Sequence, residues 1–217
     1  MATTLKIVMF RHGRIDPRDE KLLSQGDPHL DLEWVKSELP QKAEVLRGIK
    51  FDLCLSGPRK RMVETMQGLE EFGIQEIPAV QYAWDGDDVP RGVPYPRSDM
   101  EKRLDARTTY HEGKIYPEGE IDPLKEYMGD IVSLFKYIGY WYGSVTILLV
   151  TSGARMIPTE ALSRRLGPED FVDDNAMVNW ALDERNKANP VTGEAWAYTF
   201  DPDTEKIEEV EIATFKS

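Results

Sequence analysis

Two almost continuously apolar runs stand out from the mixed pattern of polar and hydrophobic positions along the chain. They are residues 5–10 (LKIVMF) and residues 145–150 (VTILLV). Such runs are typical of strands that are covered on both faces of a parallel sheet. A third run, residues 51–55 (FDLCL), is followed by Ser56-Gly57-Pro58, a turn that leads into a helix. The three runs predict the buried centre of one sheet.

Helical spacing of apolar residues separates these strands. Four helical segments are predicted: residues 32–46, the stretch from the turn at residues 56–58 to Gly73, residues 122–142 and residues 154–166. Pro40 is expected to break or kink the first of them. Strands that alternate with helices around an apolar, parallel centre predict an α/β fold. We therefore expect a three-layer sandwich with a mostly parallel central sheet.

The final third of the chain has a different pattern, in which apolar and polar positions alternate. Residues 177–182, 194–200 and 207–212 are predicted as edge strands on this basis, with a turn at residues 201–203. We expect these strands to add an antiparallel edge to the sheet.

Residues 74–120 are rich in Pro, Gly, Asp and Arg and have only weak periodicity. An irregular stretch of this length inside a compact domain is usually functional. We expect a loop-rich, lid-like insertion over the C-terminal edge of the sheet, within a single domain that spans residues 1–217.

Composition narrows the classes of partner. The net charge is −12 over 217 residues, so the composition shows no excess of basic residues of the kind that binds a nucleic acid. Neither a run of 18 apolar residues nor a signal-peptide pattern is present, so we expect no membrane partner and a cytoplasmic location. The single cysteine, Cys54, lies within a predicted strand and is interpreted as a small core residue in a reducing compartment. Any site for an anion must be a local cluster of cations.

Such cations follow the predicted strands. Arg11-His12-Gly13 comes directly after the first strand, Arg61 lies near the start of the helix after the second, and Thr151-Ser152-Gly153 follows the third. Ligands bind at this edge of open α/β sheets, and the planar fork of arginine suits phosphate. Two flanking cations favour the neutral form of His12, which is then a candidate nucleophile towards phosphorus.

This arrangement resembles the histidine phosphatase superfamily, in its phosphoglycerate mutase-like branch, over most of the chain. The resemblance rests on residues 11–13 (RHG), on residues 52–61 (DLCLSGPRKR) with Thr65 following, and on residues 149–153 (LVTSG). It implies that His12 accepts the phosphoryl group of a small phosphorylated or otherwise anionic molecule and becomes a phosphohistidine. Arg11 and Arg61 would hold the phosphoryl oxygens, and Gly13, Arg14 and Gly153 would bind substrate. No metal or cofactor is implied.

In that family a carboxylic acid in the insertion protonates the leaving oxygen. Asp85 is the best positional match, although the family usually has glutamate there, and Asp87 and Asp88 are rivals. A solvated turn explains these aspartates equally well. His29 and His111 are interpreted as surface histidines, with the alternative that His111 folds over the pocket.

Ser152 departs from the family pattern, which has a histidine at this position. Serine keeps a hydrogen-bond donor but loses the charge and much of the reach. Three hypotheses follow: a phosphatase weakened at this position, a pseudoenzyme that binds a phosphorylated ligand without turnover, and an enzyme that uses the anion pocket for another reaction. The sequence identifies neither the substrate nor the oligomeric state.

Overall fold

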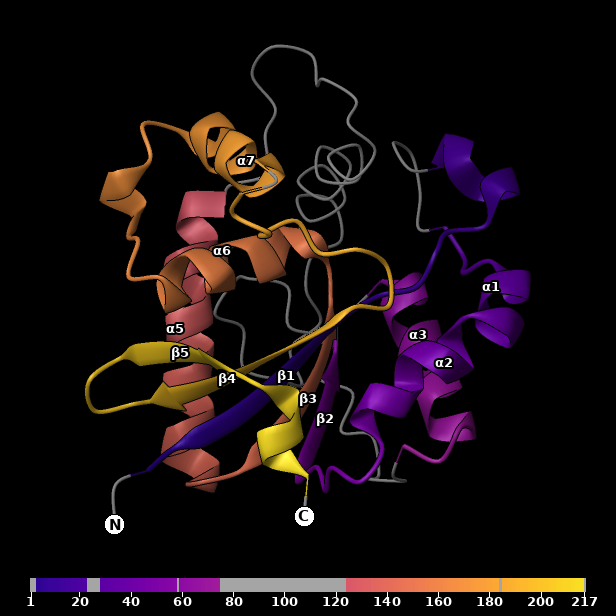
Figure 1. The fold of residues 1–217 in the computed structure, drawn as a ribbon, viewed down its shortest axis with the longest axis horizontal. Coiled ribbons are helices and arrows are strands. Elements are labelled where there is room, and N and C mark those ends of the chain that lie inside the picture. The colour runs from indigo at the N-terminus through magenta and orange to yellow at the C-terminus, as the bar shows by residue number, and fades with distance from the viewer. Residues whose placement is uncertain (1–2, 23–27, 58, 75–123, 184, 217) are drawn as a thin grey trace, which may run out of the picture.

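A five-stranded mixed sheet forms the centre of the computed structural model, which describes residues 3–22, 28–57, 59–74, 124–183 and 185–216. The strand order is β2-β3-β1-β4-β5 (Figure 1). The strands are β1 (Leu5–Arg11), β2 (Leu53–Ser56), β3 (Thr146–Thr151), β4 (Ala195–Asp201) and β5 (Lys206–Val210). Strands β2, β3 and β1 are parallel, whereas β4 and β5 are antiparallel. The predicted parallel centre and antiparallel edge are confirmed.

The register brings the carboxyl ends of the three parallel strands together. Arg11, the last residue of β1, pairs with Thr151 at the end of β3. On the other side of β3, Ser56 at the end of β2 pairs with Val150. The segments that follow these strands therefore start side by side at one edge of the sheet.

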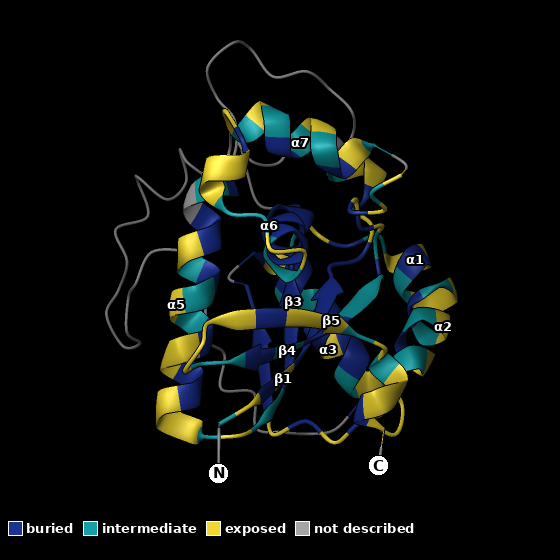
Figure 2. Cartoon of the chain, turned by 60° about the vertical axis from the view of Figure 1, so that its left-hand side comes forward, coloured by how far each residue is buried: buried dark blue, intermediate teal, exposed yellow. Residues whose placement is uncertain are grey.

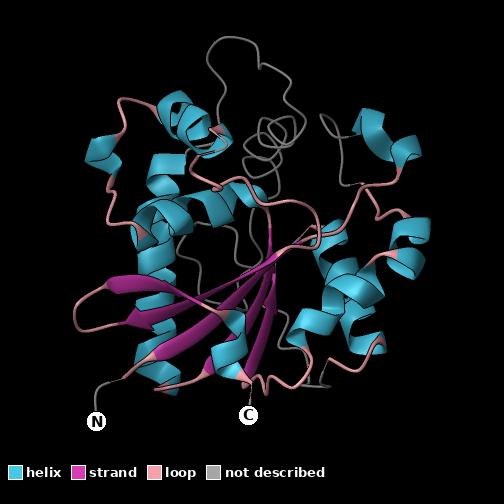
Figure 3. Ribbon diagram, viewed as in Figure 1, coloured by secondary structure: helices cyan, strands magenta, loops and turns pink. Residues whose placement is uncertain are grey.

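Helices cover both faces of the sheet, as Figure 3 shows. On one face lie α5 (Leu124–Tyr142) and α6 (Gly153–Ser163), and α7 (Asp174–Leu182) packs against α5. On the other lie α1 (Leu32–Ser37), α2 (Leu39–Ala43) and α3 (Lys60–Glu71). Short 3₁₀ helices span Pro17–Leu22, Glu44–Leu46, Pro168–Asp170 and Ile212–Phe215. These elements confirm the predicted three layers.

The side chains of β1 alternate between two hydrophobic clusters, one on each face of the sheet. Figure 2 colours most of this strand as buried. Ile7 and Met9 belong to the cluster beneath α5 and α6, whereas Val8 and Phe10 belong to the cluster beneath α1–α3. All four side chains are fully buried. The strand is apolar throughout because both of its faces are covered.

One predicted element is wrong. Residues 177–182 form part of helix α7, not an edge strand. Asp173 caps this helix by accepting a hydrogen bond from the backbone N–H of Ala176 at 2.8 Å. Met177 and Ala181, four residues apart, are its buried positions, so the short apolar stretch follows the helical period and not the strand period.

The predicted helix over residues 32–46 is divided. Helix α1 ends before Glu38, and α2 starts at Leu39 with Pro40 in its first turn. A proline in the first turn sacrifices no intrahelical hydrogen bond, so Pro40 marks a helix start here.

Three further expectations concern single features of the chain. Cys54 is buried in β2, and burial raises the pKa of its thiol to about 12, as expected for a core residue. Among the described helices, none is long and apolar enough to cross a membrane. Residues 75–120 of the predicted insertion lie outside the described residues.

Candidate active site

His12 is held at the end of β1 by the sheet itself. Its backbone N–H donates to the carbonyl oxygen of Thr151 at 2.9 Å, which extends the β1–β3 pairing one residue past the strand. The side chain is 2% exposed. The imidazole therefore lies fixed and nearly dehydrated at the carboxyl edge of the parallel strands.

The two ring nitrogens of His12 have different partners. Nδ1 lies 2.8 Å from the carbonyl oxygen of Gly13, which can only accept a hydrogen bond. The Nε of Arg61 donates to Nε2 at 3.1 Å. Together these contacts assign the proton to Nδ1 and the lone pair to Nε2. The nitrogen that carries the lone pair thus faces a guanidinium, a group that can hold an anion next to it.

Arg61 is positioned by helix α3, which begins just after β2. It is 3% exposed. One turn further along the helix, the Thr65 hydroxyl donates to the carbonyl of Arg61 at 2.6 Å and accepts from the N–H of Gly13 at 3.0 Å. Thr65 therefore ties the helix that carries the guanidinium to the loop that carries the imidazole.

Arg11 is also buried, at 7% exposed. Its Nη1 donates to the carbonyl oxygen of Pro190, in the loop that precedes β4. The backbone of Arg11 pairs with the same loop, through Glu194 at 2.9 Å and Gly193 at 3.1 Å. The loop before β4 thus anchors the second predicted phosphate ligand.

Ser152 occupies the N-cap position of helix α6, directly after β3. Its carbonyl accepts from the N–H of Arg155 at 3.0 Å, but its side chain makes no capping hydrogen bond. Gly153 is the first residue of the helix and is buried. Helix α3 likewise starts without a side-chain cap. Both helices begin near His12, so the positive ends of two helix dipoles lie there.

Comparison with solved structures finds this fold in two phosphatases and in a mutase. A glucosyl-3-phosphoglycerate phosphatase from a mycobacterium shares 16% sequence identity, with a TM-score of 0.59 over 95% of this chain and 97% of that one. For a phosphoserine phosphatase from Entamoeba histolytica the values are 16%, 0.57, 95% and 95%. For a phosphoglycerate mutase from Bacillus anthracis they are 13%, 0.56, 100% and 98%.

The chain shares the fold of these two phosphatases and of this mutase. No protein-family model matches the sequence, and no curated protein matches it significantly. At the sequence identities above, the likeness establishes the fold alone, and the roles of individual residues have to be argued from the site.

The packing of Trp34 requires a glycine at position 13. A Cβ atom at position 13 would lie 2.2 Å from Cζ3 of the Trp34 ring, which is fully buried. The substrate-binding role predicted for Gly13 remains a prediction, whereas its packing role is clear from this contact.

Replacing Gly13 with alanine is expected to lower the free energy of unfolding by about 1–3 kcal/mol, because a buried side chain has to move. Urea denaturation measures this change. Gly129 is the matched control, because a Cβ there meets nothing within 4 Å and Gly129→Ala is expected to stabilise helix α5. Equal stability of Gly13→Ala and the wild type would contradict the account.

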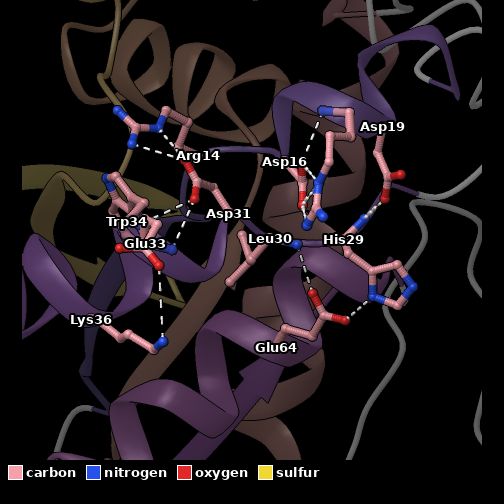
Figure 4. Close-up of polar contacts among 11 residues, drawn as sticks. Arg14, Asp16, Asp19, His29, Leu30, Asp31, Glu33, Trp34, Lys36 and Glu64 are labelled. Atoms are coloured by element: carbon pink, nitrogen blue, oxygen red, sulfur yellow. Dashed lines mark hydrogen bonds and ion pairs between the residues drawn. The ribbon is translucent and has the colours of Figure 1, made fainter.

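Arg14, predicted as a substrate ligand, is half exposed and ion-paired. Its guanidinium lies 2.9 Å from Asp31 (Figure 4). It also lies 3.4 Å from Glu38. Asp31 also caps helix α1. These contacts direct Arg14 towards α1 and hold together the loop that follows His12.

The far end of that loop is fastened to helix α3. The carboxylate of Glu64 accepts from the backbone N–H of Leu30 at 2.8 Å and pairs with the exposed imidazole of His29 (Figure 4). Because Glu64 precedes Thr65, both ends of the loop are tied to the helix that carries Arg61. His29 is confirmed as a surface histidine.

Two buried arginines at this edge were not identified from the sequence. Arg59 is 5% exposed and Arg155 is 6% exposed. The signal that identified Arg61, an arginine shortly after a predicted strand, was available for both. Asp85, Asp87, Asp88 and His111 lie outside the described residues. Among the residues that are described, no group of three or more His, Cys, Asp or Glu side chains could hold a metal ion.

Proposed function

We propose that this chain is a phosphoric monoester hydrolase that works through a phosphohistidine at His12. The observation that carries the proposal is the 3.1 Å contact between Arg61 Nε and His12 Nε2, in which a buried guanidinium donates to the nitrogen that we propose as the nucleophile. An anion that enters this site meets the cation and the nucleophile together. Buried guanidinium groups of this kind stabilise the charge that develops on the transferring phosphoryl oxygens.

The first half of the reaction forms a nitrogen–phosphorus bond. Arg61 turns its donors to the phosphoryl oxygens and releases the Nε2 lone pair, which attacks phosphorus as the ester P–O bond breaks. The leaving oxygen takes a proton from a carboxylic acid, and we propose Asp85 for this role. The hydrogen bond from Nδ1 to the Gly13 carbonyl stabilises the positive charge that develops on the ring.

The second half of the reaction returns the enzyme to its starting state. Water attacks the phosphohistidine with loss of a proton to the same carboxylate, and the N–P bond breaks. Inorganic phosphate leaves, and the lone pair returns to Nε2. Ser152 would supply a neutral hydroxyl donor to the phosphoryl group and no charge.

The substrate we propose is a small phosphorylated molecule. Among the proteins of similar fold, the phosphoserine phosphatase was crystallised with phosphoserine and with 3-phosphoglyceric acid. These ligands support a compact phosphomonoester as the substrate class.

Ser152 supports a second candidate, a protein that binds a phosphorylated ligand without turning it over. A neutral hydroxyl gives weaker hydrogen bonds than a charged donor, so binding by Arg11 and Arg61 would persist while transfer slows. This candidate differs from the hydrolase in turnover and not in affinity.

A combined binding and turnover assay separates the two candidates. We expect vanadate to bind the wild-type protein, a panel of phosphomonoesters to release phosphate, and Arg61→Met to weaken both. Vanadate binding with no phosphate release would favour the second candidate. Absence of vanadate binding would contradict both, because each requires the anion site.

A further inference from the structure

Four large aromatic side chains are exposed together at the end of helix α5. They are Tyr137, Tyr140, Trp141 and Tyr142, and we refer to them as the aromatic patch. Tyr140 is 81% exposed, and Figure 2 colours this end of the helix as exposed. Within the described residues, the other exposed large hydrophobic side chains are aliphatic and scattered along the chain: Leu32, Val172, Leu182 and Val191. Single exposed hydrophobic residues are ordinary on a protein surface, whereas a contiguous group of this kind marks a contact surface.

The position of the aromatic patch follows from the helical period of α5. Phe135 and Ile138 pack in the core beneath the helix. Tyr137 and Trp141 are four residues apart on the side of the helix that faces away from the core, with 6.2 Å between their ring centroids. Tyr140 packs edge-on against Trp141 at 5.2 Å and 88°. These ring contacts hold the patch in place, so less side-chain entropy is lost when a partner covers it.

The aromatic patch lies at the opposite edge of the sheet from His12. Helix α5 ends at Tyr142, and β3 begins shortly afterwards at Thr146 (Figure 1). The backbone of His12 is bonded to Thr151, at the other end of β3. The six residues of this strand span about 20 Å. A partner that covers the patch therefore leaves the carboxyl edge of the sheet open.

The area of the aromatic patch reaches what a dimer of this chain needs. A Tyr or Trp side chain buries about 150–250 Å², so the exposed parts of the four side chains amount to about 500 Å². Two copies that meet through the patch then bury about 1,000 Å², the lower limit for a specific interface. Exposed polar residues on the same end of the helix and just after it, Ser133, Lys136 and Ser144, extend the contact area.

The charges at the aromatic patch are compatible with contact between two copies. In a two-fold dimer the same surface faces itself, so a patch with charges of one sign would repel its copy. The four residues of the patch are uncharged. At its edge, one turn before Tyr140, Lys136 pairs with Glu205 at 2.6 Å, so both signs are present there. Tyr and Trp are also the side chains that contribute most to the energy of interfaces.

We propose that the aromatic patch is the contact surface of a two-fold symmetric dimer of this chain. The two active sites lie at the far edges of the two sheets, so the dimer leaves both of them open. The proposal goes beyond the phosphoryl chemistry and does not depend on it. Because the buried area is at the low end for specific complexes, we expect a dimer Kd of about 1–100 μM.

The test is the mass of the protein in solution, measured by sedimentation velocity at concentrations below and above this range. We expect the wild type to pass from monomer to dimer. Trp141→Ser removes one indole from each copy and is expected to raise the dimer Kd about 100-fold. Tyr140→Ser should act in the same direction. Leu32→Ser is the matched control, because Leu32 is 61% exposed, close to the 63% of Trp141, but lies on helix α1, and it should keep the wild-type Kd.

The dependence on salt distinguishes a second copy from a partner that is held by opposite charge. Each copy carries a net charge of −12, and salt screens the repulsion between the two copies. We therefore expect the dimer to become tighter as the salt concentration rises. A dimer that dissociates in salt would contradict the proposal, because charged contacts and not the aromatic patch would then hold it.

The remaining outcomes also decide. A monomer at every concentration would overturn the proposal, and this result needs no variant. A dimer that Trp141→Ser and Tyr140→Ser leave unchanged, or that Leu32→Ser weakens equally, would overturn it as well. A monomer that binds phosphatidylcholine vesicles or an oligoarginine peptide through Trp141 would assign the patch to a membrane surface or to a basic partner instead. None of these measurements requires turnover, so failure of the proposed hydrolase activity leaves the test unaffected.

Discussion

Replacement of His12 by alanine is expected to lower phosphomonoester hydrolysis by at least about 10³-fold, because removal of a covalent nucleophile typically costs this much or more. The measurement is the steady-state rate of phosphate release with the best ester of the panel. Vanadate should still bind to the variant, since Arg11 and Arg61 remain. His29→Ala is the matched control, because that imidazole is exposed and is paired with Glu64, and it should change the rate little.

Two results would contradict this prediction. If His12→Ala kept the wild-type rate, His12 would not be the nucleophile. If His12→Ala and His29→Ala lost activity to the same extent, the effect would lie in the loop that both histidines flank and not in the chemistry.

Replacement of Ser152 by histidine is expected to raise the turnover rate by about 10²–10³-fold, the amount that one transition-state donor contributes. An imidazolium at the N-cap of α6 would direct a charged donor to the phosphoryl oxygens, where serine directs a neutral one. The measurement is phosphate release by the variant and the wild type side by side. Imidazole has an ordinary pKa of about 6.5 and carries the charge below it, so the gain should be larger at pH 6 than at pH 8.

Size and charge are separated by a control at the same position. Ser152→Asn adds a neutral side chain that also donates a hydrogen bond, and we expect it to give a much smaller gain than Ser152→His. The double variant Ser152→His with His12→Ala should lose the gained activity. Equal activity of Ser152→His and the wild type would show that position 152 does not limit catalysis.

The sequence predicts the centre of this fold well for physical reasons. A strand such as β1 must be apolar on both faces, because a helical layer lies over each, and few other structures produce such a run. The prediction fails for residues 177–182, because the order of apolar and polar residues in this six-residue stretch fits the helical period as well as the strand period. The N-cap residue Asp173, which favours the helix, lies before the alternating stretch.

The candidate site is predictable where it follows a strand directly. His12 and Arg61 were both placed by this rule, and the structure brings them into contact at 3.1 Å. The tautomer of His12 was not predictable, because it depends on the Gly13 carbonyl at 2.8 Å. The contacts of Arg155 were not predictable either, because Tyr127 and Asp130 lie on another helix.

Arg14 shows the limit of assigning roles from motif position. Its place after residues 11–13 predicts a substrate ligand, yet its guanidinium pairs with Asp31 and Glu38. The position of a residue in the sequence fixes where its backbone lies but not which neighbour its side chain contacts.

The central claim, that His12 carries the phosphoryl group, is tested most directly by trapping the intermediate. The protein is mixed with a phosphomonoester labelled in its phosphoryl group and is quenched in alkali, in which a phosphohistidine survives. We predict one label per chain at most, bound to the peptide that contains His12, lost in acid and absent from His12→Ala. Turnover of the ester with no label on that peptide, or with a label that persists in His12→Ala, would contradict the account.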